Sequence, residues 1–123
     1  MIHLDTSALI GALCGSRLAA PALRRMIADG DRIGTSSLVL YEWWRGPREP
    51  EELRAQQALV PHTQAFPFGT AEAALAAELY RKVKGARGRE LDLAIAAVAI
   101  TNGAALWTLN PRDFRDIPGL ELA

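Results

Sequence analysis

Four acidic residues stand where their side chains could hold a cation together. Asp5 closes the apolar segment IHL, Glu42 lies within LVLYEWW, Asp92 directly precedes LAIAAVAI, and Asp113 follows shortly after ALW. A carboxylate in such surroundings is costly to bury without a partner. Four such placements together favour a shared cation. Because the set offers hard oxygen ligands without His or Cys, it suits Mg²⁺ or Mn²⁺ better than zinc.

Two of the acids also have an ordinary structural interpretation. Asp92 could cap a helix through a free backbone N–H, and Asp113 could be a turn residue. The chemical interpretation therefore depends on whether the fold brings all four carboxylates to one place.

The elements that must position these acids alternate between strands and helices. Apolar runs and turn residues predict strands over 2–5, 32–35, 63–68 and 105–108, with a short last strand over 120–122. Helices are expected after Asp5, with Thr6 or Ser7 as the cap, and over 18–28, 38–44, 49–59, 70–84 and 91–101. This alternation indicates an α/β fold with a mostly parallel sheet of four to five strands between two helical layers.

In a parallel sheet the functional site lies beyond the carboxyl ends of the strands. Asp5 and Asp113 follow expected strands, while Glu42 and Asp92 lie in the first turns of expected helices. We therefore expect all four acids to face the same edge of the sheet.

Bulk composition describes an ordinary globular protein. The 123 residues fit one domain spanning 1–123, and half of them are hydrophobic. Fourteen basic residues balance fourteen acidic ones, so net charge gives no indication of a nucleic-acid partner. Cys14 is the single cysteine, which excludes an intrachain disulfide, and we expect it to be a small core residue. The N-terminal sequence is unlike a secretion signal and the longest apolar run, 93–100, is too short for a membrane span, so we expect a cytoplasmic protein.

Four segments of the sequence resemble the blocks of a known family. LDTSALI, SSLVLYEWWRG, GRELDLAIAA and TLNPRDFRDIPG, each containing one of the four acids, look like the PIN domain. They are similar in particular to the VapC-type toxin ribonucleases of type II toxin–antitoxin systems. The match runs from residue 2 to about residue 122 in the family's order and spacing. One departure is the ending GLELA, which lacks the Asn-Pro-Trp-like tail of many relatives and puts the last strand in doubt.

The resemblance implies an Mg²⁺- or Mn²⁺-dependent endoribonuclease with Asp5, Glu42, Asp92 and Asp113 as its catalytic and metal-binding residues. Asp5 and Asp92 would be the principal ligands, and the other two would contribute directly or through water. Glu90 matches an additional acid of many relatives. Ser7 and Asn110 match positions that orient the acids or a water, although a helix cap and a turn residue explain them almost as well. The implied partners are an RNA substrate, a small antitoxin and a second copy of the chain.

Basic residues flank the acids, as an RNA substrate would require. Lys84, Arg87 and Arg89 precede Asp92, and Arg45 and Arg112 lie close to the other acids. We expect these five to contact phosphates, against the alternative of a solvated helix end. Trp43 and Trp44 are adjacent and must point to different sides of one helix, so one packs in the core and the other can meet a base or a partner. His3 and His62 are expected to be structural.

Three other functions compete with a toxin nuclease. The chain could be a PIN nuclease of RNA processing or decay, or a catalytically silent module that binds RNA or protein. The complete set of four acids argues against the silent module, which would have no chemical need for them. A phosphotransfer domain with Asp5 as nucleophile is disfavoured because Ser7 stands where a second Asp would be needed and no lysine is clearly placed.

Overall fold

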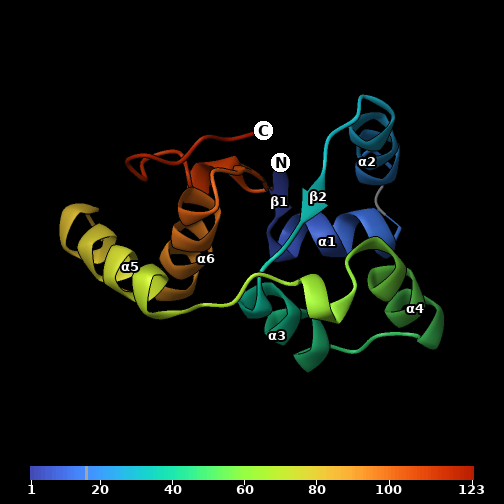
Figure 1. The fold of residues 1–123 in the computed structure, drawn as a ribbon, viewed down its shortest axis with the longest axis horizontal. Coiled ribbons are helices and arrows are strands. Elements are labelled where there is room, and N and C mark those ends of the chain that lie inside the picture. The colour runs from blue at the N-terminus through green and yellow to red at the C-terminus, as the bar shows by residue number, and fades with distance from the viewer. Residues whose placement is uncertain (16) are drawn as a thin grey trace.

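A parallel sheet with three strands forms the centre of the molecule. The computed structural model describes residues 1–15 and 17–123, and in this part of the chain the strand order is β2-β1-β3. The strands are β1 (Ile2–Leu4), β2 (Ile33–Gly34) and β3 (Ala105–Trp107) (Figure 1). Ile2 pairs with Ile33 on one side and with Ala105 on the other, in parallel register. The carboxyl ends of all three strands therefore meet at one edge.

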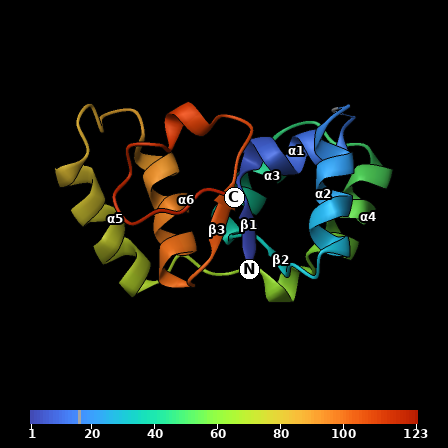
Figure 2. The same ribbon diagram turned by 90° about the horizontal axis from the view of Figure 1, so that it is seen from above.

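Helices lie on both sides of this sheet. The six α-helices of the described residues are α1 (Thr6–Leu13), α2 (Ala19–Ala28), α3 (Ser37–Arg45), α4 (Pro50–Leu59), α5 (Thr70–Lys82) and α6 (Glu90–Thr101). In both views α5 and α6 lie on the side of β3, whereas α1, α2 and α4 lie on the side of β2 (Figures 1 and 2). The α/β fold predicted from the alternation of elements is confirmed, with a smaller sheet than expected.

Helix α6 forms the centre of the hydrophobic core. All seven residues from 93 to 99 are buried, because small alanines let α5 and the sheet approach this helix closely. Large side chains fill the remaining space, among them Leu93, Leu9 and Trp43. Each such buried side chain contributes roughly 1.5–3 kcal/mol. Asp92 therefore lies at the start of a firmly packed helix.

Hydrogen bonds hold the carboxyl ends of the strands together. The backbone N–H of Asp5 donates to the carbonyl of Trp107 at 3.1 Å. The hydroxyl of Thr35, which follows β2, donates to the carbonyl of Leu4 at 2.8 Å. Side chains that leave this edge therefore start from a shared, fixed backbone.

The strand predicted over 63–68 is wrong except at one residue. This segment contains a short 3-10 helix (His62–Gln64), and Phe66 then makes an isolated parallel bridge with Ser36. The N–H of Phe66 donates to Thr35 at 3.0 Å, and its carbonyl accepts from Ser37 at 2.9 Å. Pro67 has no N–H to continue this ladder, so the pairing stops.

The last strand, predicted over 120–122, is also reduced to a bridge. Leu122 pairs with Leu106 in parallel, and the N–H groups of Leu106 and Ala123 complete the two hydrogen bonds at 2.8 Å each. Pro118 and Gly119 directly precede this segment and favour a turn over a longer strand. The sheet of four to five predicted strands is thus three strands with one bridge at each outer side.

Two local expectations about the first helix are corrected. Asp5 caps α1 itself, because its carboxylate accepts from the N–H of Ala8 at 2.8 Å, whereas Thr6 and Ser7 are the first helical residues. Cys14 is exposed at the C-terminal end of α1 and is not a core residue. Among the described residues, no helix combines the length and the apolar character needed to cross a membrane.

Candidate active site

The four predicted acids come together in one cavity at the carboxyl edge of the sheet. The cavity has a volume of about 290 Å³ and receives the residue that follows β1, residues from α1, α3 and α6, and the segment after β3. Its lining consists of Asp5, Thr6, Ser7, Ile10, Glu42, Asp92, Ile95, Asn110, Asp113 and Phe114. Residues that are more than one hundred positions apart in sequence thus share one acidic site.

Asp5 is the most deeply buried of the four acids. It is 4% exposed, and its carboxylate accepts hydrogen bonds from the Ala8 N–H at 2.8 Å and the Ser7 hydroxyl at 2.7 Å. Burial raises the pKa of Asp5; hydrogen bonds with Thr108, Ala8 and Ser7 oppose this rise, and the nearby charge of Glu42 adds to it. Asp5 is therefore held in one orientation at a cost that a neighbouring cation would offset.

The Ser7 hydroxyl connects the ends of β1 and β3. It donates to Asp5, accepts from the N–H of Leu109 at 2.9 Å, and lies 3.3 Å from the hydroxyl of Thr108. The prediction that Ser7 orients an acid agrees with this geometry, while the competing role of helix cap falls to Asp5. Thr108 belongs to the same network, and its sequence context gave no signal of that role.

Replacing Ser7 with alanine should lower the free energy of unfolding by about 1–3 kcal/mol, because it removes a hydrogen bond to a carboxylate and leaves the Leu109 N–H without its acceptor. Urea unfolding of the metal-free protein measures this change. Ser37→Ala is a suitable control, since Ser37 is an exposed residue at the start of α3 and lies outside the cavity. A Ser7→Ala protein as stable as this control would show that the network adds nothing to the fold.

Glu42 reaches the cavity from the second turn of α3. The helix starts where Ser36 accepts from the N–H of Val39 at 3.2 Å, and this cap fixes the register that points Glu42 toward α1. One carboxylate oxygen of Glu42 accepts from the Thr6 hydroxyl, and the other lies 3.2 Å from Arg45. Thr6 thus positions Glu42 much as Ser7 positions Asp5, and sequence reasoning missed it.

The surroundings of Asp92 strongly raise its pKa. Asp92 lies in the first turn of α6, and its pKa is raised to about 6. Loss of solvent is the largest cause, followed by the negative charges of Asp113, Glu42 and Asp5, while Arg89 partly opposes them. The raised pKa of Asp92 indicates that the protein only partly neutralises the negative charge of the neighbouring acids.

Asn110 and Asp113 approach from the segment after β3. Asp113 ends a 3-10 turn (Pro111–Asp113), and its N–H donates to the carbonyl of Asn110 at 3.0 Å. The N–H of Asn110 in turn donates to the Thr108 hydroxyl at 3.0 Å. This turn carries the fourth carboxylate to the cavity opposite Asp92.

Comparison with known proteins identifies the family of this chain. Residues 2–120 match the PIN domain. The chain belongs to the PIN-domain family. Ribonuclease VapC19 of Mycobacterium tuberculosis is 33% identical over 120 residues, which cover 96% of this chain and 95% of the relative.

Solved structures of toxin–antitoxin complexes contain a similar fold. A toxin–antitoxin complex from Klebsiella pneumoniae contains a chain with a TM-score of 0.74 and 26% identity, over 98% of this chain and 95% of that one. VapBC2 from Rickettsia felis, bound to a DNA fragment from its promoter, gives a TM-score of 0.76 at 23% identity, over 100% and 98% of the chains. The resemblance to VapC-type PIN domains seen in the sequence is confirmed.

The donor set of this PIN cavity fits a hard divalent cation. Within the described residues, no three Asp, Glu, His or Cys side chains are drawn together as a closed metal cage. Charge repulsion favours such an open arrangement in the absence of a cation, since two carboxylates about 4 Å apart repel by about 4 kcal/mol at an effective dielectric near 20. Mg²⁺ keeps several waters and commonly takes only one or two protein carboxylates. An open cavity with four carboxylates therefore suits Mg²⁺ or Mn²⁺, and soft or nitrogen ligands are missing from its lining.

Glu90, predicted as a fifth acid, is not brought to the acidic cavity. Its carboxylate accepts from the N–H of Gly88 at 2.6 Å and lines a separate groove between α5 and α6. The reason is helical geometry, since residues two positions apart differ by about 200° around the axis. Asp92 and Glu90 therefore face nearly opposite sides of α6.

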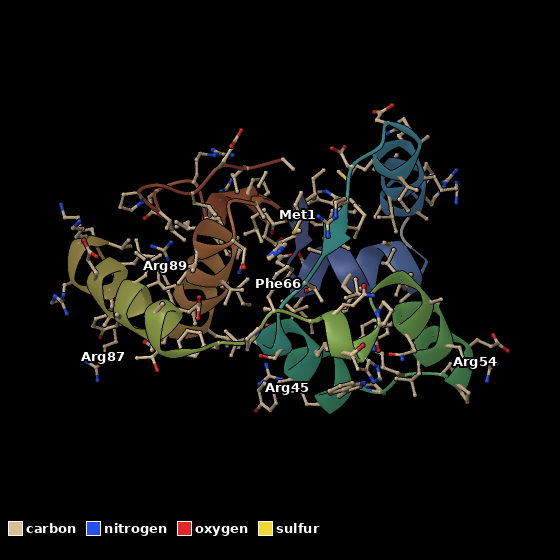
Figure 3. All side chains as sticks on the ribbon, in the orientation of Figure 1. Met1, Arg45, Arg54, Phe66, Arg87 and Arg89 are labelled. Atoms are coloured by element: carbon tan, nitrogen blue, oxygen red, sulfur yellow. The ribbon has the colours of Figure 1, made fainter. Side chains whose placement is uncertain are left out.

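The five predicted RNA-binding cations differ in their surroundings. Arg45 contacts Glu42 and the ring of Tyr41, and Arg89 is paired with Asp116. Lys84, Arg87 and Arg112 are exposed and have no ion pair among the described residues. In Figure 3 Arg89 lies next to α6, whereas Arg87 lies at the outer edge of the molecule. The structure therefore places Arg112 beside the acidic cavity, Arg87 at the outer edge of the molecule, and Arg89 in an ion pair within the protein.

Proposed function

We propose that this PIN-domain chain is an Mg²⁺- or Mn²⁺-dependent endoribonuclease and the toxin of a toxin–antitoxin pair. The observation that carries the proposal is the cavity in which Asp5, Glu42, Asp92 and Asp113 meet without a basic side chain among its lining residues. The similarity over almost the full length to a ribonuclease of the VapC type supports it. The acids alone would also suit other phosphodiester substrates, so the relatives supply the choice of RNA.

The residues of the cavity have different roles in the proposed hydrolysis. A divalent cation, when bound here, supplies a water ligand of lowered pKa and neutralises charge that develops on the phosphate. Asp5 and Asp92 hold that cation in this proposal, and Glu42 and Asp113 contribute directly or through water. Ser7 keeps the Asp5 carboxylate fixed, and Asn110 on the rim can hold a water or a phosphate oxygen.

Glu42 is held between two partners that act in different ways. The Thr6 hydroxyl fixes one of its oxygens from inside the cavity, and Arg45 contacts the other from a largely exposed position. Because the Arg45 side chain is 56% exposed, solvent weakens this ion pair. Arg45 is therefore free to turn to an RNA phosphate while Thr6 keeps Glu42 in place.

A second, more open cavity adjoins the acidic one and carries positive charge. Its volume is about 360 Å³, and Asn110 and Asp113 line both cavities. Arg112 and Arg115 line the second cavity, and both are exposed. A phosphate next to the scissile one would lie within reach of these guanidinium groups. We therefore assign this rim to the RNA backbone.

Changing both Arg112 and Arg115 to alanine should weaken RNA binding and flatten its dependence on salt. Each phosphate contact that is lost reduces the slope of log affinity against log salt by about 0.7 on a single strand, so two contacts change it by about 1.4. Fluorescence anisotropy with a labelled RNA at several salt concentrations measures the slope, and Mn²⁺ affinity should stay at the wild-type value. Arg24→Ala with Arg25→Ala, on the exposed side of α2, is the matched control. A slope equal to that of the control would assign these arginines to solvent alone.

The proposed protein partners are an antitoxin segment and a second copy of the chain. Of the two adjacent tryptophans, Trp43 is fully buried and Trp44 is 48% exposed, packed edge-on against His62 at 4.8 Å. Tyr41 on the same helix is 56% exposed. Exposed aromatic side chains of this kind are common anchors in protein interfaces, so we place the antitoxin contact on this face of α3.

RNA cleavage by the purified chain, with and without a divalent cation, tests the proposed nuclease activity. The purified chain should cleave a single-stranded RNA in the presence of Mg²⁺ or Mn²⁺ and lose this activity with EDTA. Binding of RNA without cleavage in either metal would favour the silent binding module, and cleavage that persists in EDTA would contradict the metal site.

A further inference from the structure

The Arg89 guanidinium makes three hydrogen bonds to the segment after β3, outside the acidic cavity. Its two terminal nitrogens bind both oxygens of the Asp116 carboxylate, at 2.9 and 2.7 Å, and one of them also donates to the backbone carbonyl of Asp113 at 2.8 Å. Asp113 and Asp116 belong to the segment after β3, whereas Arg89 is the N-cap residue directly before α6. One side chain therefore joins two elements that each carry a cavity acid.

The backbone on the α6 side of this contact is well fixed. The carbonyl of Arg89 accepts from the N–H of Leu93 at 3.0 Å, and its own N–H donates to Ala86 at 2.9 Å. Gly88, with φ of +88°, provides the turn that leads into the helix. The Arg89 side chain is only 23% exposed, so it leaves from an anchored and partly covered position.

The Asp113 side of the contact is a short turn. Its 3-10 turn is three residues long, is held by the short-range bonds Asp113 to Asn110 and Phe114 to Pro111, and is followed by the buried Phe114. Asp113 is exposed, and Asp92 and Asp113 repel each other across the cavity. The contact of Arg89 with the Asp113 carbonyl ties the turn to α6 against this repulsion.

We propose that Arg89 and Asp116 form a clamp that sets the distance between the Asp92 and Asp113 carboxylates. Arg89 is then a positioning residue that acts through the Asp113 backbone, and Asp116 holds its guanidinium in the required orientation. The proposal deepens the proposed function, because the distance matters only if these two acids share a cation. Partners outside the ligand set commonly change metal affinity or activity about ten- to one-hundredfold.

The clamp competes with a role of Arg89 in RNA binding, and the two roles predict opposite results for Asp116→Asn. If Arg89 binds phosphate, this change frees its charge and strengthens RNA binding. If Arg89 is a clamp, the change replaces one carboxylate oxygen of residue 116 with an amide NH2 group, which cannot accept from Arg89. The contact loses its negative charge and one hydrogen bond, and the Asp113 turn loosens. One variant at a 51% exposed side chain therefore separates the two roles without disturbing the core.

The experiment titrates Mn²⁺ into the full-length Asp116→Asn protein by calorimetry. We expect Mn²⁺ affinity to fall about tenfold, with a lower kcat and an unchanged KM for RNA. Asp29→Asn, at the exposed end of α2, is the matched control and should behave as wild type. Wild-type Mn²⁺ affinity together with tighter RNA binding would overturn the clamp.

Arg89→Lys supplies a second, independent variant. Lysine keeps the positive charge near the acids but cannot bind both oxygens of Asp116 and the Asp113 carbonyl in the same fixed fork. The clamp predicts a loss of Mn²⁺ affinity equal to that of Asp116→Asn. If charge alone matters, Arg89→Lys should retain wild-type affinity, and this result would contradict the proposal.

Amide hydrogen exchange in the metal-free protein gives a readout that does not depend on the proposed function. In Asp116→Asn the N–H groups of Asp113 and Phe114 should exchange about tenfold faster, while that of Leu93 stays protected. Unchanged exchange would overturn the clamp even if the nuclease is real. Faster exchange in a chain whose wild type binds no Mn²⁺ would leave the clamp standing and remove the metal-dependent nuclease.

Discussion

Asp92→Asn is expected to abolish RNA cleavage while leaving the metal-free protein at least as stable as the wild type. Asparagine keeps the shape of the side chain but removes the negative charge needed to hold a cation. A metal ion contributes several kcal/mol to the stabilisation of the transition state, so the rate should fall by about 10³-fold or more. Cleavage of a labelled RNA at saturating Mg²⁺ measures the loss.

The stability effect follows from the raised pKa of Asp92. Between its unfolded value of 3.8 and its folded value of about 6, the folded protein holds the proton more tightly than the unfolded chain. Stability from this group is therefore complete below about pH 4 and is lost as the pH rises past 6. A tenfold change in proton affinity corresponds to about 1.4 kcal/mol, and solvent screening at this half-buried position leaves about 1–2 kcal/mol in total.

Asp92→Asn does not undergo this titration. Its stability relative to wild type should rise by about 1–2 kcal/mol between pH 4 and pH 7.5 in EDTA, as measured by urea unfolding at each pH. Added Mg²⁺ should stabilise the wild type and leave the variant unchanged. Glu90→Gln is the control, because Glu90 lies on the same helix but outside the acidic cavity. An Asp92→Asn protein that cuts RNA at the wild-type rate would refute the site.

The sequence predicts the position of the site better than the extent of the sheet. Asp5 and Asp113 could be placed because they follow short apolar runs that favour buried strands, and parallel strands share one carboxyl edge. Glu42 and Asp92 follow from the starts of their helices. The structure gathers all four in one cavity, while their roles in metal binding and catalysis stay predictions.

The predicted outer strands were too long, because an apolar pattern does not show whether a neighbouring strand is available for backbone pairing. Residues 63–68 and 120–122 have apolar side chains to bury, yet each segment makes only one bridge close to a proline, Pro67 or Pro118. Backbone pairing at the edge of a sheet depends on N–H groups that proline removes. The sequence shows the prolines but not how little pairing remains.

The roles of Thr6 and Thr108 were missed because the sequence around a hydroxyl side chain does not show which distant residue it will contact. Thr6 and Thr108 contact cavity residues 36 and 101 positions away in sequence. Arg89 was predicted to bind RNA because it lies in a basic run, whereas its partner Asp116 follows 27 residues later. A basic run shows local charge, and only the fold shows which charges are already neutralised.

Expression of the wild-type chain alone is expected to stop the growth of its host, and a small protein encoded beside it should restore growth. The motivation is the similarity to a VapC-type ribonuclease over 96% of the chain, together with an acidic cavity that is open to solvent. Colony counts after induction measure the effect, and we expect a loss of several orders of magnitude.

Asp5→Asn is the inactive variant that the structure favours for this experiment. Asparagine keeps an oxygen that accepts from the Ala8 N–H and the Ser7 hydroxyl, so the cap of α1 survives. An alanine at this position would lose both bonds and could remove toxicity by unfolding the chain. Growth with Asp5→Asn, at equal soluble expression, therefore assigns the toxicity to the acidic site.

Rescue by the neighbouring protein should act through a segment that covers the site. An arginine of that segment could form a bidentate contact with the cavity carboxylates and compete with the cation. If the segment also covers α3, it should bury Trp44, and the tryptophan emission should shift to shorter wavelength on binding. Trp44→Phe removes this signal without touching the acids and serves as the control. A soluble wild-type chain that leaves growth unchanged would exclude the toxin and leave a nuclease of RNA processing or decay.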